Sequence, residues 1–340
     1  MVRDYASAGV DIDAEGAAVR AIISQISGSL KTQKGGVGEV LTGIGHFCSL
    51  LRLDSKRALA IATDGVGTKI KVAEAMGKYD TIGIDLVAMN VNDIICSGAK
   101  PISLVDYLAV QKPEPHVAEE IGKGLAKGAE LAGISISGGE IATLPEMVKG
   151  IDLAGTGVGI VDIEKIVTGG KIEPGDVVVG LESLGIHSNG LTLARKVLLK
   201  HYSIHDRIFG KKTVGEELLQ PTKIYVREVM ELLEKVDVRG LANITGGGLG
   251  NLARITSYGF SIEKSPEPQE VFKRIQELED ISDQEMYRTF NMGVGFCIVV
   301  KEKHTDKTIR ICSKHGTEAW TIGHVVKTPG VHIKDFTLSY

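Results

Sequence analysis

Apolar residues recur along this chain in short uninterrupted runs and in longer, helically spaced stretches, a pattern that predicts alternating strands and helices. In the first half, the short runs predict strands at 58–65, 103–110, 134–140 and 151–161. The longer stretches predict helices at 14–28, 83–99 and 114–132. A glycine-rich segment at 31–50 predicts a loop between the first helix and the first strand.

A polar segment at 165–176, which contains proline and glycine, interrupts this pattern and predicts a domain boundary near residue 168. Beyond it, strands are predicted at 176–183, 241–245, 295–300 and 321–326. Helices are predicted from about residue 190, at 213–235 and at 303–315. Strands and helices alternate in both halves. We therefore expect an α/β to α+β protein of two domains, 1–168 and 169–340.

The composition excludes several classes of protein. A chain of 340 residues that is 43% hydrophobic and 24% charged can bury a sizeable core without a disulfide or metal. The net charge is −4, no lysine and arginine block occurs, and 5% of residues are aromatic, so we expect no nucleic-acid partner. No apolar run reaches the roughly 18 residues of a membrane span and no signal sequence is present. The four cysteines form no C-x-x-C pair. We expect a cytoplasmic protein with no membrane partner.

Glycine is unusually common, at 42 residues, but its clusters match no nucleotide-binding motif in full. No G-x-x-x-x-G-K-[S/T] occurs, and the clusters at 155–159 and 246–250 both lack the third glycine of the dinucleotide motif. The second cluster falls between a predicted strand and a predicted helix, where its N–H groups suit an anion. Taken alone, each cluster favours an ordinary tight turn.

Carboxylates stand at the ends of two predicted strands and inside an apolar predicted helix. Asp64 and Glu140 each follow a strand and lie beside glycine. On the helix, Asp85 and Asn92 are seven positions apart, within about 20° of each other around the axis, and Asp93 lies on the same half. Polar residues in such a helix require partners. Two explanations stay open: helix caps and loop contacts, or a Mg²⁺ site formed by Asp64, Asp93 and Glu140.

Donors gather at two turns. Lys69 follows Asp64 closely, and His187, Ser188 and Asn189 lie between two glycines directly before a predicted helix. Three such side chains at a helix N-terminus suit a phosphate or a polar substrate. An N-cap turn with a surface histidine explains the same residues equally well, and a lone lysine is more often solvated.

Eight collinear segments resemble the phosphoribosylformylglycinamidine cyclo-ligase family over nearly the whole length of the chain. They are YASAGVDIDA at 5–14, TDGVGTKIKVA at 63–73, IGIDLVAMNVNDI at 82–94, SGGEIATLPEMV at 137–148, GLESLGIHSNGLTLARK at 180–196, LQPTKIYV at 219–226, ITGGGLGNL at 244–252 and TFNMGVGF at 289–296. The family belongs to an ATP-using superfamily that includes selenophosphate synthetase and thiamine-monophosphate kinase. One departure is Thr143, where the family commonly has an acidic residue.

The resemblance implies an ATP- and Mg²⁺-dependent enzyme that cyclises a phosphorylated substrate, formylglycinamidine ribonucleotide. It also implies a homodimer in which the N-terminal domains pair their sheets into a barrel. Asp64, Asp93 and Glu140 are the implied metal ligands, and Lys69 and His187 the implied catalytic residues. The implied nucleotide-binding residues are Gly35, Gly36, Gly38, Asp64, Gly65, Gly67, Thr68, Asp85, Asn92, Gly138 and Gly139. The implied substrate-binding residues are His187, Ser188, Asn189, Gly246, Gly247 and Gly248.

Two alternatives are weighed against this one. Among sister enzymes, selenophosphate synthetase is expected to carry a reactive cysteine before the first glycine loop, whereas Cys48 follows that loop. Thiamine-monophosphate kinase is not expected to carry HSNG. A non-catalytic nucleotide-binding protein would have no need of the acidic set.

Overall fold

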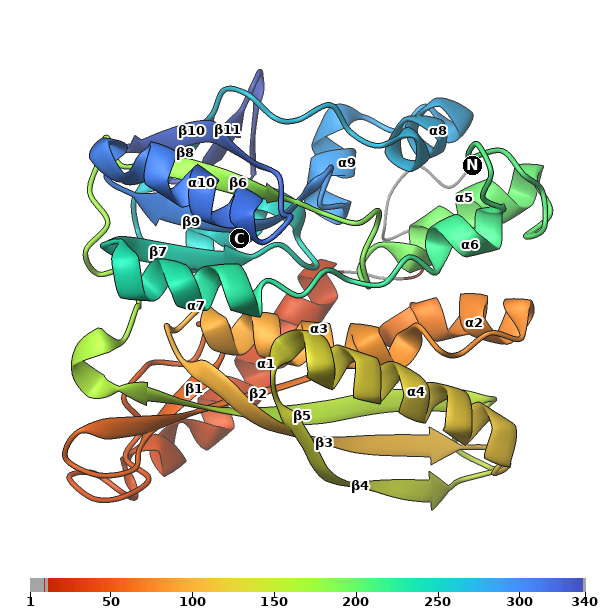
Figure 1. Ribbon diagram of the computed structural model, residues 1–340, viewed down its shortest axis with the longest axis horizontal. Coiled ribbons are helices and arrows are strands. Elements are labelled where there is room, and N and C mark those ends of the chain that lie inside the picture. Colours follow the sequence, from red (N-terminus) through yellow and green to blue (C-terminus); the bar gives the residue numbers. More distant parts are fainter. Residues whose placement is uncertain (1–8, 10–11, 339–340) are drawn as a thin grey trace.

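Two β-sheets divide the computed structural model, which describes residue 9 and residues 12–338, into an N-terminal and a C-terminal part (Figure 1). The first sheet has five strands in the order β1-β2-β5-β3-β4, and the second has seven in the order β12-β11-β8-β10-β6-β9-β7. Both are mixed, because β3 runs parallel to β4 and β11 parallel to β8, while the other paired strands are antiparallel. The predicted mixed architecture of helices and sheets is confirmed. The resemblance at 5–14 falls largely outside the described residues.

The N-terminal part contains all the strands predicted for it and one that was not predicted, β1. The strands are β1 Ser49–Arg52, β2 Arg57–Gly65, β3 Lys100–Val110, β4 Ser135–Thr143 and β5 Ile151–Asp162. The helices are α1 Ile12–Ile26, α2 Ile70–Met76, α3 Ile82–Ile95 and α4 Pro115–Ala132.

The C-terminal part places its helices on both sides of the larger sheet (Figure 1). Its strands are β6 Val177–Glu182, β7 Val238–Asn243, β8 Gly259–Ile262, β9 Val294–Val300, β10 Ala319–Val326, β11 Val331–Ile333 and β12 Phe336–Leu338. Its helices are α5 Leu191–His201, α6 Val214–Leu218, α7 Val226–Lys235, α8 Glu270–Glu279, α9 Asp283–Thr289 and α10 Thr305–Lys314, with the 3₁₀ helix η4 at Gly248–Arg254. The predicted boundary near residue 168 falls between β5 and β6.

Glycines bring α3 close to its neighbours. A Cβ on Gly83 would approach the Leu125 nitrogen to 2.4 Å, so only glycine lets α3 and α4 cross at this distance. On β5, a Cβ on Gly159 would lie 2.5 Å from the Ile94 side chain. The cluster at 155–159 is therefore neither a turn nor a nucleotide loop. It is part of β5, and the apolar helix α3 packs against its backbone.

The helix predicted at 213–235 is wrong. The structure has two helices there, α6 and α7, joined by an irregular segment at 219–225. Pro221 explains the break, since proline lacks an N–H and disfavours helical backbone at the residue before it. We call residues 219–225 the strap, because they lie against α3 of the N-terminal part.

In the part of the chain that the structure describes, no helix is both long enough and apolar enough to cross a bilayer.

Candidate active site

The turn after β2 carries Asp64 toward the C-terminal part. The Gly65 N–H donates to Asp64 Oδ1 at 2.7 Å, which fixes the carboxylate at the end of the strand. Four residues after Asp64, Thr68 Oγ1 lies 2.9 Å from Thr192 Oγ1, in the first turn of α5. The turn at 64–69 therefore meets the start of the helix that follows the 187–189 turn.

The turn at 187–189 also lies against the glycine loop after β7. A Cβ on Gly246 would come within 3.2 Å of Asn189 Oδ1, so the Asn189 side chain lies against the backbone of the loop. Asn251 holds the loop, accepting from the Thr245 N–H at 2.8 Å and donating to the Gly246 carbonyl at 3.0 Å. The Nδ2 of Asn189 is buried without a hydrogen-bond partner. This amide is available to a ligand.

Asp93 completes the arrangement from α3. Asn243, at the end of β7, donates to Asp93 Oδ1 at 2.9 Å. Burial raises the pKa of Asp93 to about 7, the Asn243 hydrogen bond opposes that rise, and the nearby charge of Asp64 adds to it. Burial also raises the pKa of Asp64. Two adjacent carboxylates that both resist ionisation mark a place where negative charge is incompletely balanced.

These contacts join the two parts of the molecule at one place, where the charges of Asp64 and Asp93 lie near each other. We call it the junction site, and it comprises residues 64–68, Asp93, residues 187–189 and residues 243–248. Arg254 lies beside it, stacked 4.1 Å from the centre of the Phe47 ring and donating to the Gly45 and His46 carbonyls. Carboxylates from one part thus stand near amide donors and a glycine loop from the other. This combination can hold a phosphorylated ligand and a cation.

Lys69 and Asp85 do not belong to the open part of this site, contrary to the roles predicted for them. Both are completely buried and form an ion pair at 2.8 Å. Lys69 Nζ also donates to the carbonyl of Gln220 on the strap. Because protein acceptors enclose its ammonium, Lys69 is not placed to offset charge on a phosphate. Burial lowers its pKa, and the charge of Asp85 opposes this change.

Asn92, predicted to bind nucleotide, is also engaged by the strap. Its Nδ2 donates to the Lys223 carbonyl at 2.8 Å, and its Oδ1 accepts from the Tyr225 N–H at 3.1 Å. Asp85 and Asn92 do share one face of α3, as their spacing predicted. That face binds the neighbouring strap, so the protein itself engages both side chains, and their nucleotide-binding role stays a prediction.

His187 is a buried hydrogen-bond acceptor rather than an exposed proton shuttle. It is 4% exposed, with a left-handed backbone (φ 64°), and its Nε2 accepts from the Leu184 N–H at 3.1 Å. Burial and the charges of Lys69 and Lys223 lower its pKa to about 3. The imidazole is therefore neutral at physiological pH. These contacts support a role in fixing the turn, and the catalytic role of His187 stays a prediction.

Glu140 does not join Asp64 and Asp93. Through the β-sheet register Asp64 is level with Gly155, Asp106 and Gly139, whereas Glu140 pairs with Tyr107 in the next row. Successive strand residues point to opposite faces, so Glu140 faces away from α3. It also lies three strands from β2, roughly 14 Å at the usual strand spacing. Among the described residues, no three His, Cys, Asp or Glu side chains form a metal-binding group. The three-carboxylate metal site is a wrong prediction for a single chain.

Two sets of predicted nucleotide-binding glycines also lie elsewhere. Gly138 and Gly139 are in the edge strand β4, where a Cβ on Gly139 would collide with the Asp106 carboxylate at 2.3 Å. Gly35, Gly36 and Gly38 belong to a loop held against β1 by the hydrogen bond from the Gly38 N–H to the Arg52 carbonyl. Arg52 pairs with Ala58, six residues or about 20 Å along β2 from Asp64. Gly35, Gly36 and Gly38 are therefore remote from the junction site.

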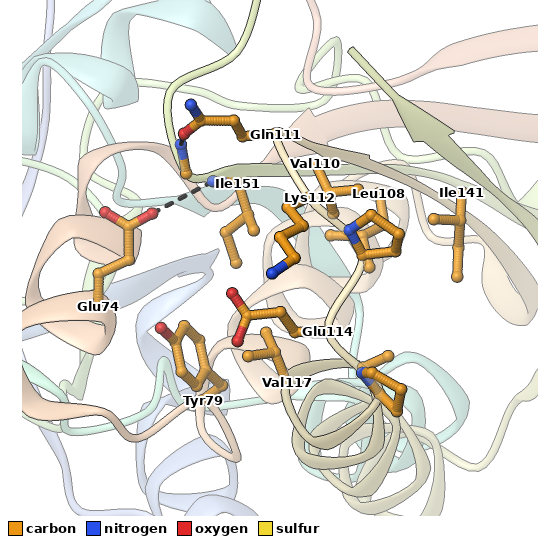
Figure 2. Close-up of a pocket in the computed structure, with 14 residues that line it drawn as sticks. Glu74, Tyr79, Leu108, Val110, Gln111, Lys112, Glu114, Val117, Ile141 and Ile151 are labelled. Atoms are coloured by element: carbon orange, nitrogen blue, oxygen red, sulfur yellow. Dashed lines mark hydrogen bonds between the residues drawn. The ribbon is translucent and has the colours of Figure 1, made fainter. Parts of the chain in front are cut away.

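Two cavities of the molecule are lined by other residues. One, of about 460 Å³, lies between the end of β3 and the start of α4; Lys112 and Glu114 point into it, and Glu74 accepts from the Ile151 N–H at 3.2 Å (Figure 2). The other, of about 760 Å³, lies between α7 and the segment 164–171. Neither is lined by Asp64, Asp93 or the 187–189 turn. The perturbed carboxylates and the convergence of turns, rather than cavity volume, mark the junction site.

Sequence reasoning missed several residues that shape the junction site. They are His46, Thr222, Asn243, Asn251 and Arg254. Pro221 was the available signal for the strap, since a proline should have ended the predicted helix. No local pattern marks Asn243 or Arg254, because their partners are distant in sequence.

Comparison with known proteins first defines the class. Residues 45–161 match the N-terminal domain, and residues 173–335 the C-terminal domain, of AIR synthase related proteins. The fold is shared with the structure of AaThiL complexed with AMPPCP and TMP, at a TM-score of 0.66 and 19% identity over 94% of each chain.

Full-length relatives narrow the class to one family. The chain is 49% identical over 332 residues to phosphoribosylformylglycinamidine cyclo-ligase of Thermococcus kodakarensis, covering 98% of both chains. It is 52% identical over 326 residues to the protein of that name from Methanothermobacter thermautotrophicus, covering 94% of both. The chain belongs to the phosphoribosylformylglycinamidine cyclo-ligase family, a family of enzymes.

Proposed function

We propose that this chain closes the imidazole ring of a purine precursor, converting formylglycinamidine ribonucleotide and ATP into 5-aminoimidazole ribonucleotide, ADP and phosphate. Identity of about half the residues to cyclo-ligases over nearly the full chain supports the reaction. The observation that carries the proposal is the junction site, where Asp64 and Asp93 of one part meet the 187–189 turn and glycine loop of the other.

The chemistry requires activation of a poor leaving group. An amidine nitrogen attacks the formamide carbon, and the amide oxygen leaves readily only after phosphoryl transfer from ATP has made it part of a phosphate. The protein then acts mainly by positioning and charge neutralisation. The Asn189 amide and the N–H groups of Gly246 and Gly247 would hold the ribonucleotide. The N-terminus of α5 adds a favourable field for its phosphate.

The residues present fit a magnesium ion. Asp64 and Asp93 offer hard oxygen ligands whose raised pKa reflects burial, and a cation beside them would relieve the cost of ionising both. Two carboxylates plus phosphate oxygens and water are a usual Mg²⁺ environment. Bound there, Mg²⁺ would reduce the charge on the ATP phosphates. We do not include Glu140 among its ligands.

We also propose a homodimer formed through the uncovered face of the first sheet. Val105 and Tyr107 on β3 are 42% and 44% exposed, although both are apolar or aromatic strand residues. Partly exposed Ile61 and Val158 pair with each other on β2 and β5 and lie level with Ser103, two residues along the same face from Val105. A second copy packed on this apolar face would give the paired-sheet barrel implied by the resemblance. We place this dimer in the cytoplasm, in keeping with four unpaired cysteines among the described residues.

A product assay tests the proposed reaction. Purified protein is incubated with ATP, Mg²⁺ and formylglycinamidine ribonucleotide, and the diazotisable aminoimidazole product is measured beside ADP. We expect the two products in equal amounts. ATP binding without either product would contradict the reaction, and thiamine monophosphate would then be the next substrate to assay.

A further inference from the structure

A continuous hydrogen-bonded path joins the two turns of the junction site through the interior of the protein. Asp85 Oδ1 accepts from Lys69 Nζ at 2.8 Å, and from the backbone N–H and the hydroxyl of Thr222, each at 2.7 Å. Thr222 Oγ1 lies 3.0 Å from Ser188 Oγ. The path starts one residue after Thr68 and ends one residue before Asn189. It therefore links the carboxylate turn to the turn proposed to hold the ribonucleotide.

The direction of each bond follows from the chemistry of the groups. An ionised Asp85 only accepts, so the single hydroxyl proton of Thr222 is donated to it. Ser188 must then donate its own proton to Thr222. All four side chains are at least nine-tenths buried, so water does not compete for these bonds. The orientation of Ser188 is consequently set by Asp85, a residue on a helix of the other part of the molecule.

The irregular backbone of the strap makes this connection possible. Because Pro221 interrupts the helix, the Gln220 carbonyl is free to accept from Lys69 and the Thr222 N–H is free to donate to Asp85. Beside this path, His187 Nε2 accepts from the Leu184 N–H. The 187–189 turn is thus fixed both within its own part and across the junction.

We infer that Asp85, acting through Thr222, is a positioning residue that fixes the 187–189 turn relative to the Asp64 turn, so that the two substrates are held at the distance and orientation that the reaction requires. This inference rests on the proposed function, because the relative position of the turns matters only if each turn holds one substrate. A displacement of about 1 Å between reacting groups can lower a rate by about 100-fold. Loss of the path should therefore lower kcat while each substrate still binds its own turn.

Thr222 offers a matched pair of variants. Thr222→Val keeps the size and the backbone N–H but removes the hydroxyl, whereas Thr222→Ser keeps the hydroxyl. We expect kcat to fall about 10- to 100-fold in the valine variant and by less than about threefold in the serine variant. The Kd for ATP should change by less than about twofold in both. Thr308→Val is the control, because Thr308 is an equally buried threonine on α10, whose hydroxyl donates to the His304 carbonyl at 3.0 Å.

Ser188→Ala tests the other end of the path and keeps the inference testable if Thr222→Val does not fold. Since both changes break the same bond, their effects on kcat should not multiply in the double variant. Equal kcat in Thr222→Val, Thr222→Ser and Thr308→Val would overturn the positioning role, as would multiplying effects. If the unaltered protein forms no aminoimidazole, the proposed function fails and the inference fails with it. If the unaltered protein is active and the variants match it, only the inference fails.

Discussion

Two carboxylates on one helix, Asp85 and Asp93, have opposite surroundings. Asp85 Oδ1 receives three protein donors, including the ammonium of Lys69. Asp93 receives one amide donor, and burial raises its pKa to about 7 with Asp64 nearby. A carboxylate compensated by the protein supports structure, whereas one left undercompensated is suited to bind a cation or a ligand. The first therefore joins the two parts of the molecule, and we propose that the second serves the chemistry.

The largest expected effect follows from breaking the compensated pair. Asp85→Asn leaves Lys69 buried without a counter-charge, which should lower the free energy of unfolding by about 3–5 kcal/mol. Thermal and urea denaturation near neutral pH would measure the loss. The double variant Lys69→Met, Asp85→Asn should recover part of it, since neither charge then remains. An unchanged melting temperature in Asp85→Asn would contradict the role given to this pair.

Asp93→Asn should have the reverse effect, with activity lost and stability kept. Turnover is expected to fall by more than about 100-fold, because the variant loses a carboxylate proposed to hold the Mg²⁺ that would reduce the charge on the ATP phosphates. Stability without metal should stay the same or rise, since an amide avoids the cost of a buried carboxylate. The coupled assay and a melting curve in chelator would be compared with those of the unaltered protein. Near-normal turnover would refute the assignment of Asp93.

His187 provides a smaller, pH-dependent effect beside the strap. Its pKa is about 3 in the folded protein, against 6.5 as the ordinary value. Between these pH values the unfolded chain binds a proton that the folded protein does not, so stability falls as pH falls. The slope from this residue should be about 1.4 kcal/mol per pH unit.

His187→Asn isolates that contribution, because asparagine tolerates the left-handed backbone but does not titrate here. Denaturation between pH 6.5 and about pH 4.5 should show a shallower decline in the variant. His46, whose pKa burial lowers to about 4, contributes equally to both proteins. Identical slopes would show that His187 is not the titrating group.

Eight of the described strands, β2–β7, β9 and β10, were predicted because they are local apolar runs, whereas β1, β8, β11 and β12 were not predicted. Asp64, Asp93, Asn189 and the glycine loop at 246–248 were also identified as site residues, and the structure brings them together. The buried ion pair of Lys69 and Asp85 was not predicted, because an ion pair and a phosphate site require the same residue types. Only the packing of the strap on α3 distinguishes them.

The most direct test of the contrast between the two carboxylates is a thermal shift on adding Mg²⁺ with the ATP analogue AMPPCP. A ligand that binds the folded state raises its melting temperature. We predict a shift in the unaltered protein and in Thr222→Val, and none in Asp93→Asn. A shift in Asp93→Asn equal to that of the unaltered protein would contradict the account, because the cation and nucleotide would then be held elsewhere.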